Sequence, residues 1–261
     1  MYYGLLSLAS KKAAGYGTLT TAWITATGET DVTILSALNT LESDLNTYGL
    51  TSKMKYLYPF VGGTSTKHSY NFMNTAAYQL TFSGGWTHSS TGALPNGTNA
   101  YANTGFNPST EISNTSGNVG VYLRTNNSGN TLDFGVSAGG NRMYLCTDYN
   151  GTTGYAGYAS EFSYTSAATT GLYSLGRLSS VDSNIKLFRN GTTNLYNANP
   201  GLGSLPNANN YLGASNENGT ATYFSSRQLA LAYASSGLTN TEISNLYTAV
   251  QAFQTTLSRN V

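Results

Sequence analysis

The sequence predicts an all-β protein, an antiparallel sandwich with a C-terminal helix and an N-terminal helical arm. Short segments with alternating apolar and polar residues recur at intervals of roughly 10 to 15 residues, separated by clusters of Gly, Asn, Ser and Thr. The tripeptide Asn-Gly-Thr, which suits tight hairpins, occurs four times. These intervals leave no room for the crossover helices of a parallel sheet. We therefore expect antiparallel sheets packed face to face.

Residues 1–52 are expected to form an N-terminal arm followed by an assembly helix. The first part, 1–28, is rich in Gly, Thr and Ala, and we expect it to be held by another subunit. Thr30 and Gly49 mark the expected start and stop of the helix. Five residues within it recur at steps of four and three, as in a short coiled coil: Ile34, Leu38, Leu41, Leu45 and Tyr48. The helix either packs on its own sandwich or forms a self-associating stalk, and the narrow stripe favours the stalk.

The sandwich is expected to span residues 53–261. Pro59 lacks an amide proton for a strand ladder, so the segment 56–60 should be an edge strand. A loop is expected to start at Trp86 and run to Gly97. Further strands are predicted at 68–72, 78–82, 100–106, 119–124, 131–136 and 142–147. The single cysteine, Cys146, excludes an intrachain disulfide and is expected to be a small buried residue.

The four Asn-Gly-Thr tripeptides begin at Asn96, Asn150, Asn190 and Asn218. Asn-Gly supplies the two positive φ angles of a type I′ hairpin turn, and the Thr re-enters the strand. Each tripeptide also fits an N-glycosylation acceptor. We favour hairpin turns, because the spacing fits hairpins and we expect no secretory signal. The pattern is clearest over 184–196, where a strand, an Asn-Gly turn and a second strand follow one another.

The last strand and the helix after it form the pattern around which the chain is organised. Residues 228–234 alternate large and small side chains, and the large ones are expected on one face: Leu229, Leu231 and Tyr233. Thr239 and Glu242 have the spacing of a capping box. An apolar stripe comes next at helical spacing, made of Ile243, Leu246, Tyr247, Val250, Phe253 and Leu257. We expect this helix to close the β structure by lying on it.

These closing segments resemble a known group of domains. The last strand with 237–247, Gly-Leu-Thr-Asn-Thr-Glu-Ile-x-x-Leu-Tyr, and the earlier Asn-Gly hairpin followed by Leu212-Gly213 resemble the end of LamG-like, concanavalin A-like jelly rolls. Residues 53–63 and 86–101 are similar to bacteriophage virion proteins that carry this sandwich. The resemblance covers most of the chain and implies a jelly roll. Jelly rolls host lectins, glucanases, capsid subunits and adhesins alike.

Composition limits the possible partners. Charged residues make up 9% of the chain and the net charge is +1, whereas a nucleic-acid groove needs clustered Lys and Arg. We therefore expect no nucleic-acid partner. No apolar run approaches the ~20 residues that span a bilayer, so no membrane span is expected. The lysines of the N-terminal segment follow its apolar run instead of preceding it, so we expect no signal peptide either.

Residues for catalysis are not grouped in the sequence. A glycosidase needs two facing carboxylates, and the glucanases of this superfamily carry Glu-x-Asp-x-Glu on one strand. The nearest approaches lie in the helical segment, at 29–33 and 42–46. The acids of the sandwich are scattered without a close pair: Glu111, Asp133, Asp148, Glu161, Asp182 and Glu217. His68 and His88 lack the context of a catalytic triad. We expect no enzyme activity, and a glucanase-like depolymerase is the disfavoured alternative.

Aromatic residues in the expected loops suit sugar binding, because flat rings cover the apolar faces of sugars. The candidates are Trp86, Tyr101, Tyr149, Tyr155, Tyr158 and Tyr164. The alternative for each tyrosine is a role in the core or in cross-strand pairing. The resemblance to lectins and LamG domains also raises the possibility of bound calcium, for which Asp148 and Asn150 could supply oxygen ligands. The alternative for these two residues is an ordinary turn, and no other cofactor is expected.

The resemblance implies a phage virion structural protein, such as a spike, fibre, head-decoration or tail subunit, whose lectin-like sandwich recognises a host-surface glycan. Its expected partners are other virion proteins and further copies of itself. A trimer is the assembly we expect, because spikes and fibres on virions are usually trimeric. A purely structural capsid or tail subunit without glycan binding is the main alternative.

Overall fold

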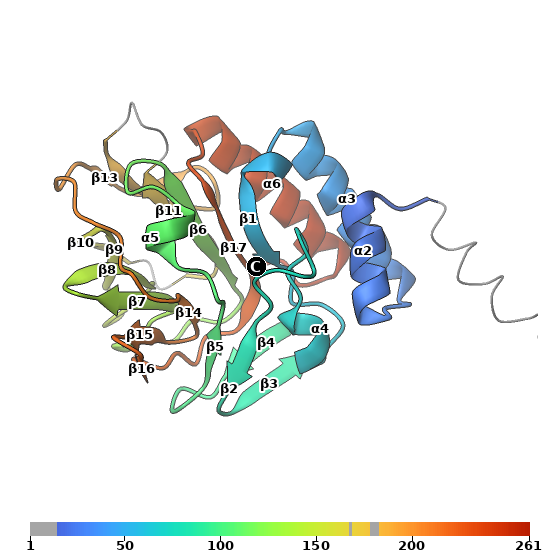
Figure 1. The fold of residues 1–261 in the computed structure, drawn as a ribbon, viewed down its shortest axis with the longest axis horizontal. Helices are drawn as coiled ribbons and strands as arrows, with labels where there is room; N and C mark the ends of the chain where they lie inside the picture. Colours follow the sequence, from blue (N-terminus) through green and yellow to red (C-terminus); the bar gives the residue numbers. More distant parts are fainter. Residues whose placement is uncertain (1–14, 167–168, 178–182) are drawn as a thin grey trace, which may run out of the picture.

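Two β-sheets face each other across one core, as Figure 1 shows, so the expected sandwich is confirmed. The computed structural model describes residues 15–166, 169–177 and 183–261. Residues 1–14, which include the N-terminal half of the expected arm, and Asp182 lie outside the described residues.

The first sheet is organised around β17 (Leu229–Ser236), which pairs with β6 on one side and with β4 and β1 on the other. Among the described residues the sheet has eight strands. The strand order is β13 (Thr193–Ala198), β12 (Ile185–Arg189), β11 (Gly171–Arg177), β6 (Gly117–Leu123), β17, β4 (Gly92–Pro95) and β3 (Trp86–Ser89), with β1 (Met54–Tyr58) beside β17. Among the described residues β1 pairs only with β17, as an edge strand does, but it ends at Tyr58, so Pro59 follows the strand and does not lie within it as expected.

The second sheet carries the surface of interest for function. Its strand order is β10 (Ser160–Thr165), β9 (Thr153–Tyr158), β8 (Asn141–Cys146), β7 (Phe134–Ala138), β14 (Tyr211–Leu212), β5 (Tyr101–Asn103) and β2 (Thr81–Ser83). The hairpin of β15 (Ser215–Glu217) and β16 (Thr220–Thr222) joins it through β15, which runs parallel to β7. The other named pairings in both sheets are antiparallel.

The core between the sheets consists of side chains that alternate inward along each strand. Val121 of β6, Val136 of β7 and Leu145 of β8 are fully buried in it. Their removal from water supplies the main driving force for bringing the two sheets together.

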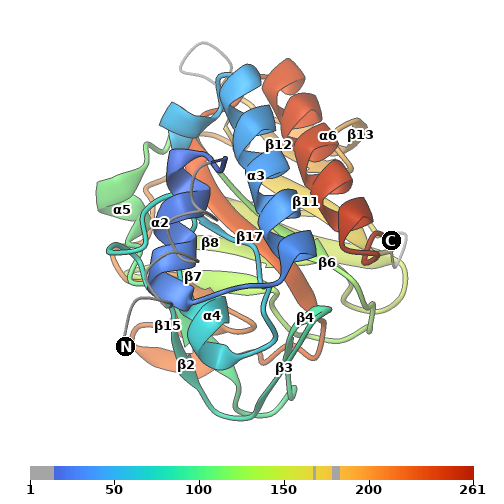
Figure 2. The ribbon, with the colours of Figure 1, turned by 90° about the vertical axis from the view of Figure 1, so that its right-hand side faces the viewer.

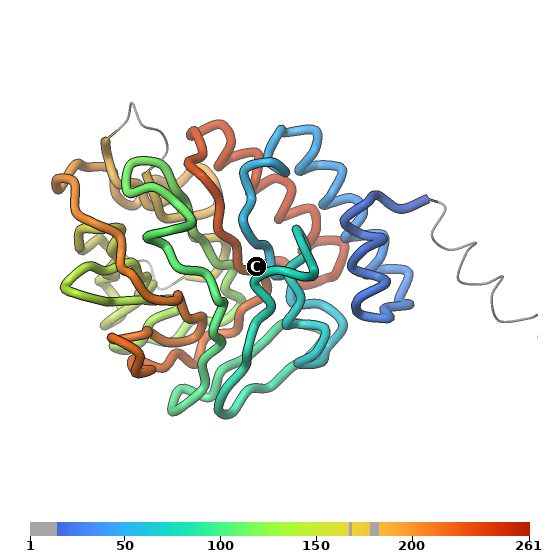
Figure 3. Tube along the Cα trace, viewed as in Figure 1, coloured from blue at the N-terminus to red at the C-terminus, as the bar shows by residue number. Residues whose placement is uncertain are grey.

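Two helices that are far apart in the sequence cover the outer face of the first sheet. α3 (Val32–Thr47) and α6 (Asn240–Thr256) lie side by side over its strands (Figure 2), and in the tube trace the blue segment of α3 lies beside the red segment of α6 (Figure 3). Leu246 and Val250 of α6 pack there with Tyr122 and Tyr233 of the sheet, in a second buried apolar cluster. The closing helix therefore lies on a sheet as expected.

The apolar stripe assigned to an assembly helix is used inside the chain. Leu38, Leu41 and Leu45 are fully buried in the second cluster, and Ile34 and Tyr48 pack against it. Of the two alternatives, the structure has the helix on its own sandwich, so these residues are not available for a seam between copies. The helix also begins later than expected, because Asp31 and not Thr30 caps its first amides.

The described part of the arm also packs on this layer. α2 (Thr18–Thr27) buries Trp23 completely in the second cluster. The Glu42 carboxylate of α3 accepts hydrogen bonds from the amides of Leu19 and Thr20 at 3.0 and 2.9 Å. These bonds satisfy free amides in the first turn of α2, where a negative charge is favourable. The remaining helical pieces are the 3₁₀ turn η1 (Thr51–Lys53), α4 (Ser65–Ser69) and α5 (Pro108–Glu111).

The strands expected at 78–82, 100–106 and 131–136 have other bounds in the structure, where they are β2, β5 and β7, and three further segments differ in the kind of element or in the facing of residues. The expected strand at 68–72 is partly α4, whose first turn is capped by the Thr64 hydroxyl. The expected loop after Trp86 is the hairpin of β3 and β4. In β17 a bulge near Ala230 breaks the alternation, so Leu229 lies in the core between the sheets while Leu231 faces the helices. An extra residue in one strand reverses the facing of the residues after it, and the residue pattern did not reveal this one.

Two of the four Asn-Gly-Thr turns have the expected backbone. Asn190 and Asn218 have φ angles of 51° and 50°, and the glycines after them have 71° and 97°, so both pairs form hairpin turns with two positive φ angles. At Asn96 and Asn150 only the glycine has a positive φ. In those two loops the Asn side-chain oxygen instead accepts bonds from backbone amides a few residues later.

Both ends of α6 are fixed by side chains. The capping box is confirmed: the Thr239 amide donates to the Glu242 carboxylate at 2.8 Å, and the Glu242 amide donates to the Thr239 hydroxyl at 3.2 Å. After the helix, the buried Arg259 guanidinium donates to the carbonyl oxygens of Pro59, Phe60 and Ala230. Burial lowers the pKa of Arg259 to about 9.

No helix in the described part of the chain is long and apolar enough to cross a membrane.

Candidate functional site

A pocket of about 290 Å³ opens on the outer face of the second sheet, on the side of the sandwich away from α3 and α6. Strands β8, β9, β10 and β15 and the loops beside them supply its walls. The lining residues are Asn130, Leu132, Arg142, Tyr144, Cys146, Tyr149, Tyr155, Glu161, Glu217 and Tyr223. The size suits a single small ligand unit, at the lower end of the range for ligand pockets.

Strand alternation explains why these side chains meet. In β8, Met143 and Leu145 point into the core, so Arg142, Tyr144 and Cys146 point to the other side. The register then aligns Tyr144 with Gly157 of β9, and Gly157 with Glu161 of β10. Polar and aromatic groups from separate strands thereby gather on one outer surface.

A glycine makes room for the pocket floor. A Cβ added to Gly157 would lie 3.1 Å from the Tyr144 ring, which shows that the ring lies against the bare backbone of β9. A larger residue at this position would require the ring to shift by a few tenths of an ångström. Gly157 thus allows the Tyr144 ring to pack closely against β9 beside the pocket.

Three charged groups line the pocket. Arg142 Nη1 lies 2.7 Å from Glu161 Oε2, in an ion pair that remains largely exposed. The hydrogen bond with Glu161 raises the pKa of Arg142, and Glu217 acts on it in the same direction. Burial, followed by the interaction with Glu161, raises the pKa of Tyr144. The Glu217 carboxylate accepts a hydrogen bond from Ser215 Oγ at 2.6 Å.

Exposed tyrosine rings form another part of the pocket lining. Tyr149 is 40% exposed and Tyr223 is 45% exposed, which is more than for the other aromatic residues that the structure describes. The rings of Tyr149 and Tyr155 meet edge to face, with centroids 5.4 Å apart and planes at 89°. Flat apolar faces therefore stand beside charged hydrogen-bonding groups within one hollow.

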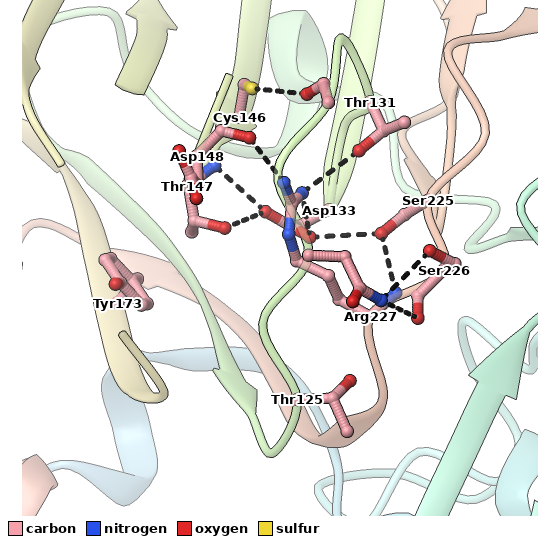
Figure 4. A network of polar contacts seen from close by, with 12 residues as sticks. Thr125, Thr131, Asp133, Cys146, Thr147, Asp148, Tyr173, Ser225, Ser226 and Arg227 are labelled. Atoms are coloured by element: carbon pink, nitrogen blue, oxygen red, sulfur yellow. Dashed lines mark hydrogen bonds and ion pairs between the residues drawn. The ribbon is translucent and has the colours of Figure 1, made fainter. Parts of the chain in front are cut away.

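A buried polar network holds the loops behind the pocket, and Figure 4 shows Asp133 near its centre. The Asp133 carboxylate accepts from the amide and hydroxyl of Thr147 at 3.1 and 2.8 Å. Its other oxygen accepts from Ser225 Oγ at 3.2 Å and pairs with Arg227 Nη1 at 3.1 Å. Arg227 also donates to the Asp148 carbonyl oxygen at 2.6 Å.

This network connects directly to the pocket wall. Leu132, Cys146 and Tyr149 of the lining are each next in sequence to a network residue. Burial lowers the pKa of Arg227, but the ion pair with Asp133 outweighs it and the pKa is raised. The fully buried pair therefore fixes three loops that shape one end of the pocket: those before β7, after β8 and before β17.

The structure separates the six aromatic candidates. Tyr149 and Tyr155 lie in the pocket. Tyr158 and Tyr164 do not belong to a binding surface, because both rings are buried in the core and their hydroxyls donate to backbone carbonyls. Trp86 and Tyr101 lie away from the pocket. The Trp86 indole donates to the Tyr101 carbonyl oxygen, and the Tyr101 ring stacks on Tyr211.

The residues considered as calcium ligands do not fit a cation site. Both carboxylate oxygens of Asp148 accept hydrogen bonds, from Ser128 Oγ at 2.7 Å and from the Gly151 amide at 2.6 Å. The Asn150 side-chain oxygen accepts from backbone amides of the same turn. The positive guanidinium of Arg227 also donates to the Asp148 carbonyl. These oxygens thus hold a turn together, and no group of three or more His, Cys, Asp or Glu side chains suited to a metal gathers within the described ranges.

Several pocket residues were missed or misjudged from the sequence. Glu161 and Glu217 counted as scattered acids, yet both line the pocket, and Arg142, Tyr144 and Tyr223 were not considered. The alternation in β8 was a usable signal, since inward Met143 and Leu145 imply that their neighbours face out.

Cys146 is buried as expected, and burial raises the pKa of its thiol to about 11. His68 and His88 pair with each other elsewhere, with their Nδ1 atoms 2.9 Å apart.

Comparison with solved structures supports the fold. No protein-family model matches the chain, and no curated protein sequence matches it. Domain 4 of AbnA, a GH43 extracellular arabinanase from Geobacillus stearothermophilus whose structure is a complex with arabinotriose, is similar with a TM-score of 0.53 and 15% identity, over 74% of this chain and 98% of that domain. At this identity the likeness shows a common β-sandwich.

Two sialidase structures are similar at lower scores. The NanB sialidase from Streptococcus pneumoniae matches 63% of this chain and 27% of its own, at 14% identity and a TM-score of 0.44. The CBM40 of the Ruminococcus gnavus IT-sialidase matches 50% of this chain and 82% of its own, at 16% identity and a TM-score of 0.39.

Proposed function

We propose that this chain is a glycan-binding sandwich and that the pocket on the second sheet is its ligand site. The observation that carries the proposal is the combination of exposed tyrosine faces with an exposed Arg–Glu fork in one hollow. The rings of Tyr155 and Tyr223 would cover the apolar face of a sugar. Arg142, Glu161 and Glu217 would bind its hydroxyl groups with charge-assisted hydrogen bonds.

The fold gives a second, independent support. The AbnA domain, which shares this sandwich, has a structure in complex with arabinotriose. Sandwich folds also serve other functions, so the likeness alone would not carry the proposal.

The experiment is a glycan array followed by titration of the best ligand with purified protein. We expect Tyr155→Ala to weaken binding at least about tenfold, because truncating an aromatic that contacts ligand commonly costs more than ~1.4 kcal/mol. Tyr101→Ala is the matched control, since it removes a half-buried tyrosine outside the pocket. Thermal unfolding of both variants separates lost binding from lost folding. Equal effects of the two changes would place the ligand elsewhere, and an array without hits would favour a purely structural subunit.

The setting we propose is a phage particle, where the chain would act as a spike, fibre, head-decoration or tail subunit and contact a host-surface glycan. The support is the sequence resemblance over 53–63, 86–101 and the closing segments. Mass spectrometry of purified particles and the adsorption of particles lacking the protein test it. Light scattering tests the expected trimer. With the α3 stripe buried, any contact between copies must use another surface.

We further propose that the pocket binds sugars without cleaving them. Glu161 and Glu217 are the carboxylates that a hydrolase would have to use here, and Glu161 is committed to an ion pair with Arg142. Glycan hydrolysis would release new reducing ends. Reducing-sugar release from a bound polysaccharide, abolished by Glu217→Gln, would instead support the depolymerase.

A further inference from the structure

The charges of the pocket do not balance. One guanidinium, Arg142, faces two carboxylates, Glu161 and Glu217. Glu161 already forms an ion pair with Arg142, in which Arg142 Nη1 lies 2.7 Å from Glu161 Oε2. Among the residues that the structure describes, Glu217 makes no ion pair, and its carboxylate accepts from the neutral hydroxyl of Ser215. The lining therefore carries one uncompensated negative charge.

This imbalance bears on the kind of sugar that fits. A sugar carboxylate needs a free cation or several hydrogen-bond donors to replace its water. Arg142, the one cation among the described lining residues, is already paired, and a carboxylate beside Glu217 would be repelled. A neutral sugar has no such problem, because its hydroxyls can donate to Glu217 and accept from the remaining N–H groups of Arg142.

We propose that the pocket selects uncharged sugar units and rejects acidic ones, with Glu217 as the residue that determines this specificity. The inference rests on the proposed function and adds the substrate class to it. The position of Glu217 supports the role: it ends β15, whereas the Tyr155 ring that would cover the sugar face comes from β9.

The test uses an array that carries neutral oligosaccharides, with arabinotriose and lactose among them, each beside an acidic counterpart such as sialyllactose. Titration calorimetry then gives the affinity ratio for the best neutral and acidic pair. We expect the acidic partner to bind at least about tenfold more weakly. Raising the salt concentration should narrow this ratio in the unaltered protein, because salt screens exposed charges.

The variant Glu217→Gln removes the charge and keeps the shape. We expect it to shift the ratio by about tenfold in favour of the acidic ligand. Glu111→Gln makes the same change in net charge in α5, outside the pocket lining, and should leave the ratio unchanged. Acidic ligands that bind as tightly as neutral ones, or a ratio that Glu217→Gln does not move, would overturn the inference while leaving glycan binding intact. An array without any hit would overturn the proposed function itself.

Discussion

The outer faces of the two sheets differ, although both sheets share one core. Over the first sheet, α3 and α6 cover a second buried apolar cluster, to which both Leu246 and Tyr233 belong. Over the second sheet, the outward side chains are Arg142, Tyr144 and Glu161, and they line an open hollow. The same strand alternation thus produces an apolar outer face on one side and a polar, aromatic one on the other.

The difference indicates where function can reside. An apolar sheet face must be covered to stay out of water, and the helices at both ends of the chain meet that need. A face with polar and half-exposed aromatic side chains can stay open to a ligand. The first sheet with its helices therefore provides stability, and under the proposed function the second sheet provides recognition. This division predicts that changes on the two sides have separate consequences.

The largest expected effect compares two arginine pairs. Arg227→Met leaves the buried Asp133 carboxylate without its cation, and breaking such a pair costs about 3–5 kcal/mol of unfolding free energy. Arg142→Met breaks the exposed pair with Glu161, which should cost less than about 1 kcal/mol. Urea unfolding of both variants measures the contrast.

The double variant Arg227→Met/Asp133→Leu provides the control for the buried pair. Removing both charges should recover much of the loss, because the cost arises from an unpaired buried charge. Equal stability losses for Arg227→Met and Arg142→Met would contradict the burial seen for Asp133.

The next effect concerns the helix layer. Leu246→Ala removes a fully buried side chain between α6 and the first sheet, and we expect a loss of about 2–5 kcal/mol. Leu202→Ala, at a residue that is 62% exposed, should stay within about 0.5 kcal/mol of the unaltered protein. Where both variants are folded, glycan affinity should be equal. A weaker affinity for Leu246→Ala would mean that the helix layer and the pocket are coupled.

The sequence predicted best those features that depend on neighbours in the chain. The bonds between Thr239 and Glu242 join residues three positions apart, and the Asn190 turn needs two adjacent residues. The apolar stripe from Leu38 to Leu45 could also be recognised in the sequence, but the surface on which it packs could not. An apolar stripe looks the same whether it packs on α6 of its own chain or on a second copy.

The pocket could not be assembled from the sequence, because its parts lie on different strands. Arg142 and Glu161 meet only through the register of β8, β9 and β10, and Glu217 comes from a hairpin much later in the chain. Register depends on every strand between them. The bulge near Ala230 shows how one extra residue shifts such facing without a signal in the residue pattern.

A smaller effect concerns the protonation of the buried His68 side chain. Burial, then the neighbouring His88 and Arg259, lowers the pKa of His68 to about 3, well below its usual 6.5. The unfolded chain therefore takes up a proton below about pH 6.5 while the folded chain does not. The stabilisation that comes from keeping His68 neutral in the folded state is complete above that pH. Below it, the free energy of unfolding falls by up to ~1.4 kcal/mol per pH unit as the pH decreases toward 3.

Unfolding free energies measured between about pH 5 and 6.5 report on His68 together with His88, whose pKa burial also lowers, since carboxylates titrate mainly below that window. His68→Gln should be less stable at neutral pH, because it loses the bond to His88 Nδ1, but its stability should change less across the window. An unchanged slope in this variant would assign the acid sensitivity to other groups.

The smallest expected effect is at the N-terminus of α6. It tests whether the outer faces of the two sheets are independent of each other. Thr239→Ala removes the hydroxyl that caps the Glu242 amide, and we expect a loss of about 1 kcal/mol. Thr248→Ala lies on an exposed turn of the same helix, where Ala is the better helix former, and should be neutral or slightly stabilising. Because α6 covers the first sheet only, neither change should alter glycan affinity on the second. A cap variant that loses affinity along with stability would show that the closing helix also supports the pocket, and the division between the two faces would then fail.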